Sequence, residues 1–171
     1  MYPPLLNIGH LSPQHGMIVL GGPITMILGL LGIIGLITYL RRWKWLWREW
    51  ITTVDHKKIG VMYIIVAVVM LLRGAADAGM MRAQQALSSG SSNGFLTSDQ
   101  FQQVFTAHGT IMIFFVAMGL MFGLINLVLP QMLGSRDVAF PFLNSTSFWL
   151  YGAGAVLINT SLVIGHEFAA T

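Results

Sequence analysis

Long apolar stretches separated by short polar ones dominate the pattern along this chain. Residues 17–40 carry no charged side chain, and about 20 apolar residues are enough for a helix to cross the hydrocarbon of a bilayer. The same pattern predicts helices over residues 59–86, 101–129 and 138–165, with Pro130 marking the end of the third. The sequence therefore predicts an all-α membrane protein with four transmembrane helices.

Polar and basic segments set the expected orientation of these helices. Residues 1–16 form a proline-containing polar lead-in, and residues 41–58 hold six of the nine Lys and Arg residues, interleaved with tryptophans. Basic loops stay on the cytoplasmic side of a membrane, and tryptophan prefers the headgroup layer. We therefore expect residues 41–58 to form a cytoplasmic interface segment and the N-terminus to lie outside.

Composition supports this class and excludes others. The chain is 55% hydrophobic and only 9% charged, whereas about a quarter of the residues in a soluble domain are charged. The net charge of +3 does not indicate nucleic acid, because the basic residues flank apolar runs instead of forming a separate stripe. There is no cysteine, so disulfides and thiolate metal sites are excluded.

One histidine, His108, falls near the start of the third predicted helix. Burial disfavours the charged imidazole, and neutral imidazole is the usual axial ligand of haem iron. A histidine that only forms a hydrogen bond with a neighbouring helix explains the position equally well. Four apolar side chains at helical spacing could line a porphyrin or pack against other helices: Phe101, Phe105, Met112 and Phe115.

Two opposite charges lie in the second predicted helix. Arg73 and Asp77 are four residues apart and so share one helix face. Ionisable groups inside a membrane are costly and are candidates for function. The alternative is an ion pair that reaches the headgroups at the outer surface.

An acid stands at the other side of the membrane. Asp137 opens the fourth predicted helix, where the helix dipole favours a negative charge. It is also placed to collect protons, because amide and hydroxyl groups on the third and fourth helices could hold a chain of water. These groups belong to Asn126, Asn144, Ser145 and Asn159.

Four continuous runs make the sequence more specific than its composition. They are WREWITTVDHKKIGVMYIIVAVVMLLRGAADAGMMRAQQAL, VFTAHGTIMIFFVAMG, GLINLVLP and SRDVAFPFLN. From about residue 45 onward the chain resembles subunit I of the haem–copper respiratory oxidases, specifically the bo-type ubiquinol oxidases. TTVDHKKIG and TAHGTIMIFF are typical of the whole superfamily, whereas LLRGAADAGMMRAQQA points to the quinol branch.

The resemblance implies a role for several of the candidate residues. His108 would be one axial ligand of the low-spin haem b, and so the metal ligand of this segment. Arg73 and Asp77 would belong to the ubiquinol site in the outer half of the membrane. Gln103 matches a glutamine of that site.

The proton side follows from the same resemblance. Asp137 would be the mouth of the D-type proton pathway, with Asn126 and Asn144 just inside it. The resemblance also implies the bacterial plasma membrane, partner subunits II, III and IV, copper, and a high-spin haem of the o or a type. The copper and haem ligands are expected in the remaining helices of subunit I, so this chain would be the N-terminal part of a larger polytopic bundle.

Three departures from the family pattern stand out. Gln100 occupies the place of a quinol-site histidine, and His166 appears as an insertion in SLVIGHEF, where the family has a sequence like SLGVGEF. The chain also stops at Thr171, before the helices that carry the second haem b ligand and the copper histidines.

The expected function is therefore that of a ubiquinol oxidase subunit whose N-terminal segment does not turn over alone. Three alternatives stay open. The chain is a non-catalytic membrane protein that packs against other helices or binds haem weakly, or a quinol-binding cytochrome without oxygen chemistry, or part of a cytochrome c oxidase subunit I.

Overall fold

The computed structural model describes residues 28, 29, 31, 32, 34–89 and 94–164. Every regular element in this part of the chain is helical: α2 (Trp43–Leu46), the π-helix η2 (Trp47–Ile51), α3 (His56–Leu87), α4 (Ser98–Thr110), the π-helix η3 (Ile111–Ala117), α5 (Met118–Met132) and α6 (Pro141–Ile164). Most of the helix expected over residues 17–40 lies outside the described residues, and so does His166. Helical backbone is described there at residues 34–39.

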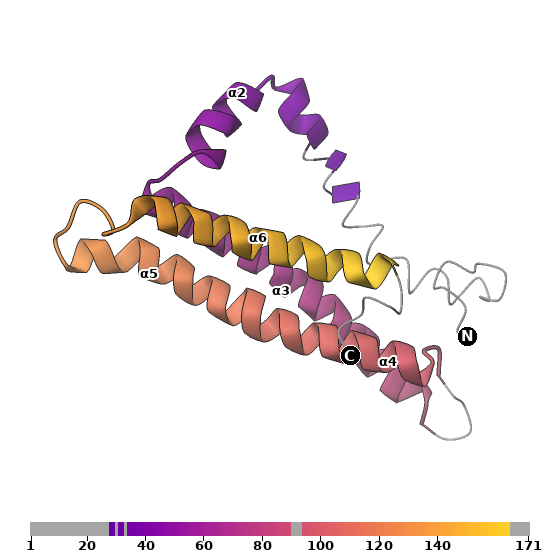
Figure 1. Cartoon of the computed structure of the whole chain (residues 1–171). Helices are drawn as coiled ribbons and strands as arrows, with labels where there is room; N and C mark the ends of the chain where they lie inside the picture. The colour runs from indigo at the N-terminus through magenta and orange to yellow at the C-terminus, as the bar shows by residue number, and fades with distance from the viewer. Residues whose placement is uncertain (1–27, 30, 33, 90–93, 165–171) are drawn as a thin grey trace.

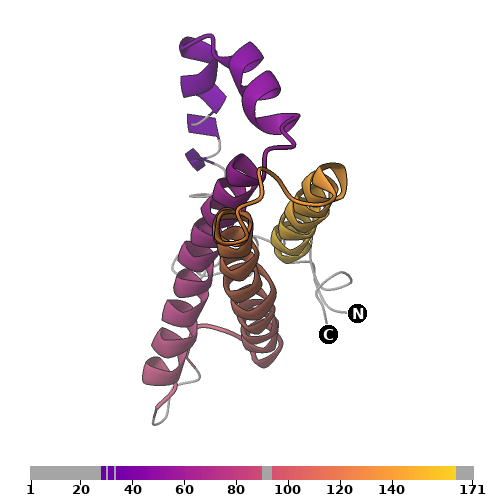
Figure 2. The ribbon, with the colours of Figure 1, turned by 90° about the vertical axis from the view of Figure 1, so that its left-hand side faces the viewer.

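Two helices are long and apolar enough to cross a membrane among the described residues. They are α3 and the continuous run of α4, η3 and α5, Ser98–Met132. These helices lie against each other, with α6 packed on the same bundle, and α2 stands beyond one end of it (Figures 1 and 2). The structure thus supports a helical membrane protein, while the count of four spans stays a prediction.

Both long helices begin three residues earlier than the sequence pattern indicates, because polar caps precede the apolar runs. Asp55 caps α3 by accepting a hydrogen bond from the Lys57 backbone N–H at 2.9 Å. Thr97 and Gln100 form a capping box at the start of α4, in which each side chain accepts from the other's backbone N–H.

The third helix does not end at Pro130, which is a correction to the sequence prediction. Pro130 lies inside α5, which continues to Met132. The stop comes from Gly134, whose φ of 66° is in the left-handed region that favours glycine. The backbone N–H groups of Gly134 and Ser135 donate to the carbonyls of Gln131 and Pro130, at 3.2 and 2.9 Å, and so satisfy the helix end.

Pro141 is the first residue of α6, so the fourth helix starts three residues after the expected position 138. Proline suits the first helical position, because its fixed φ matches the helix and its missing N–H would be unpaired there anyway. Residues 133–140 therefore form the connection between α5 and α6.

The core lies where α3, η3 and α6 meet. One buried cluster consists of Met70, Ile111, Phe115, Val116 and Ala155, and a second of Ile59, Tyr63 and Phe148. In the π-helix η3 the Phe115 carbonyl accepts a hydrogen bond from the Tyr151 hydroxyl of α6 at 2.6 Å. The irregular stretch of helix is thereby joined to its neighbour.

Glycines bring α3 and α5 into close contact, as the spacing of Gly119 and Gly123 predicts. A methyl group at Gly123 would lie 2.6 Å from the Ile64 side chain and 3.0 Å from the Gly60 carbonyl oxygen. A methyl group at Gly119 would meet Ala67 of α3 at 3.0 Å and the Tyr151 ring of α6. The predicted packing role of these two glycines is confirmed.

Candidate functional site

His108 lies in the last turn of α4 and reaches across to α3. Its Nδ1 atom is 3.0 Å from the carbonyl oxygen of Gly74. A carbonyl oxygen can only accept, so Nδ1 carries the hydrogen, and the lone pair of a neutral ring lies on Nε2. His108 is half-buried. The hydrogen bond to a neighbouring helix and the role of a metal ligand, which the sequence presented as alternatives, are thus compatible.

The four apolar residues around His108 do not act as one group. Phe115 belongs to the buried core cluster, and Met112 packs against it. Phe105, one turn before His108, is 61% exposed and is free to contact a flat ligand. The packing interpretation holds for Phe115 and Met112, and Phe105 is the ring still open to a porphyrin.

A buried ion pair lies on α3 beside the turn that His108 contacts. Arg73 Nη1 donates to Asp77 Oδ1, as the spacing of four residues predicts. The Asp77 side chain is 0% exposed, and its second oxygen, Oδ2, has no hydrogen-bond partner among the described residues. A buried carboxylate oxygen without a partner is costly, which marks Asp77 as a candidate functional residue.

The two glutamines of α4 differ in what their side chains do. Gln100 is held in the capping box with Thr97 and so helps to start the helix. Gln103 lies half-buried on the same helix, between that capping box and His108. We call this part of the molecule, α4 with the turn of α3 around residues 73–77, the His108 end.

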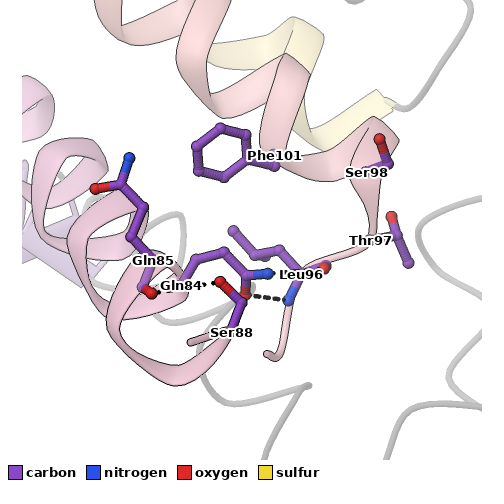
Figure 3. Close-up of a pocket in the computed structure, with 7 residues that line it drawn as sticks. All are labelled: Gln84, Gln85, Ser88, Leu96, Thr97, Ser98 and Phe101. Carbon is purple, nitrogen blue, oxygen red and sulfur yellow. Dashed lines mark hydrogen bonds between the residues drawn. The ribbon is translucent and has the colours of Figure 1, made fainter. Parts of the chain in front are cut away.

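Beyond the His108 end, Gln84 ties the α3–α4 connection to α3 (Figure 3). Its Oε1 accepts from the backbone N–H groups of Phe95 and Leu96, both at 2.8 Å. A cavity of about 330 Å³ opens beside it, lined by Gln84, Gln85, Ser88, Leu96, Thr97, Ser98 and Phe101. None of the ionisable candidate residues lines this cavity.

Asp137 lies in the connection between α5 and α6. Figure 1 shows this connection at the end of the bundle opposite α4. Its Oδ1 is 3.0 Å from Nδ1 of His56, the first residue of α3. Asp137 is 44% exposed, whereas His56 is 3% exposed and its Nε2 has no partner among the described residues. A carboxylate exposed to water is thus in contact with a buried imidazole.

Sequence reasoning missed His56, although it is part of TTVDHKKIG. One signal was present, because the second and fourth predicted helices both start on the same side of the membrane. Their first residues therefore lie at the same membrane surface, and His56 follows directly after the helix-capping Asp55.

Amide side chains continue from this end into α5 and α6. Asn144 Nδ2 donates to Asn126 Oδ1 at 2.6 Å, and Asn126 Nδ2 donates to the Phe122 carbonyl. Ser145 bonds to the Thr53 carbonyl instead. We call Asp137, His56 and this asparagine pair the Asp137 end.

Asn159 lies on α6, away from that pair. Its amide nitrogen bonds to the Ala155 carbonyl and contacts the sulfur of Met70, and its buried Oδ1 has no partner among the described residues. Among the described residues, Asn159 forms no hydrogen bond with the Asn126–Asn144 pair, so the four polar residues do not form one continuous chain of direct contacts.

The candidate residues fit a haem only in part. Nε2 of His108 is a suitable donor atom for haem iron. Within the described ranges no group of three or more His, Cys, Asp or Glu side chains is arranged to hold a metal ion. Among the described residues, His108 is therefore a candidate donor atom on its own and not part of a cluster of metal ligands.

Comparison with known proteins gives a consistent result. The sequence profile of the family described as "Cytochrome C and Quinol oxidase polypeptide I" matches residues 58–171. The quinol oxidase subunit 1 of Bacillus subtilis (strain 168) is 55% identical over 148 residues, which are 86% of this chain and 22% of that protein. The cytochrome bo(3) ubiquinol oxidase subunit 1 of Buchnera aphidicola subsp. Acyrthosiphon pisum (strain APS) is 57% identical over 159 residues, 93% of this chain and 24% of that protein.

A third relative carries a different name. The probable cytochrome c oxidase subunit 1 of Bradyrhizobium diazoefficiens is 55% identical over 155 residues, 87% of this chain and 23% of that protein. The chain thus spans about a quarter of the length of these relatives. The resemblance drawn from the sequence is confirmed, and the chain belongs to the family of cytochrome c and quinol oxidase polypeptide I.

Proposed function

We propose that this chain is the N-terminal part of subunit I of a terminal respiratory oxidase that oxidises ubiquinol and reduces oxygen to water. In the whole protein, His108 would hold a haem b that serves as an electron carrier, and helices beyond this segment would hold a high-spin haem of the o or a type and copper for the reduction of oxygen. Subunits II, III and IV, membrane lipid and the rest of subunit I are the expected partners. The protein lies in the bacterial plasma membrane with its N-terminus on the periplasmic side, and its four helices form part of the larger bundle.

The observation that carries this proposal is the arrangement on one turn of α3. Asp77, whose Oδ2 has no hydrogen-bond partner in the part of the chain that the structure describes, lies three residues from Gly74, whose carbonyl holds His108. Three residues correspond to about 4.5 Å along a helix. Oxidation of a quinol releases two electrons and two protons, so it needs a proton acceptor close to an electron acceptor.

Each side chain has a definite task in that chemistry. Asp77 Oδ2 accepts the hydrogen bond of a quinol hydroxyl, and Arg73 stabilises the carboxylate charge. Gln103 on α4 supplies a further polar group toward the ring oxygens. A bound haem supplies the one-electron acceptor. His108 holds that group through Nε2 and keeps its own proton on Nδ1, bonded to Gly74.

The Asp137 end serves the uptake of protons in this proposal. Asp137 is open to water, and Asn126 and Asn144 on α5 and α6 lie on the inward side of it as the first groups able to order water. Protons taken up there are consumed in the reduction of oxygen or moved across the membrane.

The test is ubiquinol-dependent oxygen uptake by the assembled oxidase that contains this segment. We expect Asp77→Asn to lower the rate about 100-fold or more, because the amide cannot accept the quinol proton. Asp99→Asn, in the first turn of α4, is the matched control and should leave the rate unchanged. A wild-type rate with Asp77→Asn contradicts the assignment of this quinol site.

A second candidate rests on the Bradyrhizobium relative, which is called a cytochrome c oxidase subunit. Oxygen uptake driven by reduced cytochrome c, with none driven by ubiquinol, would favour that function. The buried Asp77 oxygen argues for ubiquinol, because a protein electron donor needs no proton acceptor inside the membrane.

A further inference from the structure

We propose that Gly74 is a positioning residue for His108: its carbonyl fixes the tautomer and orientation of the imidazole, and its missing side chain lets α3 come close enough to do so. This inference rests on the proposed role of His108 as a haem ligand. Gly74 could not be recognised as a candidate from the sequence, because a glycine has no side-chain chemistry.

A hydrogen bond joins the His108 side chain to the backbone of α3. The distance of 3.0 Å between His108 Nδ1 and the Gly74 oxygen joins two different helices. A helical carbonyl has two lone pairs and uses one for its own helix, so the second can accept from the imidazole. With Nδ1–H held there, Nε2 is the nitrogen that faces the ligand.

Two side chains limit the space around Gly74. A methyl group at this position would lie 2.8 Å from the sulfur of Met112 and 3.5 Å from Ile111 Cγ2. Ile111 is fully buried, and Met112 packs against the cluster that contains it. A methyl group at residue 74 would therefore first displace the thioether of Met112, the flexible end of that side chain. Because Met112 packs against the buried cluster, we expect its displacement to disturb the contact between α3 and the helix that carries His108, and with it the hydrogen bond.

Loss of the hydrogen bond between His108 and Gly74 should change the redox properties of a metal bound by His108. A partner on the second ring nitrogen of a metal-bound histidine fixes the ring and makes it a stronger donor. Loss of this partner weakens donation to the oxidised iron more than to the reduced iron, because the ferric state has the higher charge. The haem midpoint potential should therefore rise when the bond to Gly74 is lost.

The experiment compares three variants in the assembled oxidase. Gly74→Ala should keep haem b, raise its midpoint potential and shift its low-spin electron paramagnetic resonance signal. Gly79→Ala is the matched control, since it lies on the same helix and no atom comes within 4 Å of its added methyl group. The double variant Gly74→Ala/Met112→Ala removes the sulfur contact and should return both readouts toward the wild-type values.

The outcomes separate this inference from the proposed function. Unchanged potential and signal in Gly74→Ala, with haem b present, overturn the positioning role. Haem b retained in His108→Ala overturns the ligand assignment itself.

A measurement on the unaltered oxidase covers the case in which Gly74→Ala fails to assemble. With histidine labelled by ¹⁵N and glycine carbonyls by ¹³C, solid-state nuclear magnetic resonance of the reduced protein should show a protonated His108 Nδ1 close to a glycine carbonyl. A protonated Nε2, or an Nδ1 with no glycine carbonyl nearby, overturns the inference.

Discussion

The two ends of the bundle place ionisable groups in opposite ways. At the His108 end, Arg73 and Asp77 are buried, lie on one helix and are four residues apart. At the Asp137 end, the acid is open to water in the α5–α6 connection, and its partner His56 is 81 residues away, at the start of α3. One end therefore depends on burial of charge within a single helix, and the other on the docking of separate helices.

This contrast matches what each end is proposed to do. A site that takes a quinol from the membrane needs its acceptor out of water, so that the ligand and not the solvent pairs with it. A site that collects protons needs contact with water. A substitution at one end should therefore lower the stability by a different amount from a substitution at the other, and this difference can be measured.

The largest expected effect comes from breaking the buried pair. Asp77→Ala leaves the Arg73 charge buried and uncompensated, which typically costs about 3–5 kcal/mol. We expect the temperature at which the oxidase loses haem b absorbance to fall clearly. Asp99→Ala is the control, and an equal shift in both variants would remove the special cost assigned to burial.

Helix docking should come next in size, because the Asp137 end depends on close contact between α3 and α5. Gly60→Ala would place a methyl group 2.9 Å from the Gly123 carbonyl, which is backbone and cannot swing away. We expect a loss of about 1–3 kcal/mol, measured from the denaturation midpoint in mixed detergent micelles. Gly79→Ala, with open space around it, should instead gain up to about 1 kcal/mol from helix propensity.

The contact between His56 and Asp137 is expected to contribute less, since one partner is half-exposed. A double-mutant cycle with His56→Ala and Asp137→Ala should give a coupling energy of about 0.5–1.5 kcal/mol. The same denaturation midpoints provide the measurement. Additive effects would mean that the two helices dock without help from this contact.

The smallest effect concerns Glu49 of the exposed segment η2. Its Oε2 lies 2.5 Å from Nζ of Lys58, which is in the first turn of α3. The hydrogen bond and charge of Lys58 hold the pKa of Glu49 below its usual value of 4.5. The pair therefore adds stability above about pH 4.5, and this contribution is lost as the pH falls below that value. Tryptophan fluorescence of α2 and η2 should change in this range at low salt, and Glu49→Gln should abolish the change.

Local patterns explain which parts of this molecule could be predicted. The Arg73–Asp77 pair follows from a spacing of four on one helix, and the packing of Gly119 and Gly123 follows from the same rule. The apolar runs gave the helices but not their ends, because Asp55, Thr97 and Gly134 set the ends through capping. A pattern of hydrophobic residues does not contain that chemistry.

Contacts between distant segments could not be predicted in the same way. The partner of Asp137 depends on how three helices dock, and the partner of His108 is a backbone carbonyl that every residue possesses. The π-helix η3 also has no signature in the apolar run IMIFFVA. In each case, the identity of the partner is decided by packing and not by residue type.

The π-helix has a consequence for how this span tolerates changes in length. Bonds between residues five apart accommodate one residue more than those of an α-helix, so a single deletion within Ile111–Ala117 could leave an unbroken apolar helix. Such a deletion would turn the wide π-turns into α-turns, so the two halves of the span would keep nearly the same rotational phase, with His108 beside Gly74 and Asn126 beside Asn144. A deletion elsewhere in Ser98–Met132, where no π-turn absorbs it, would turn one half relative to the other by about 100°. The π-helix is therefore the part of the span that tolerates a change in length.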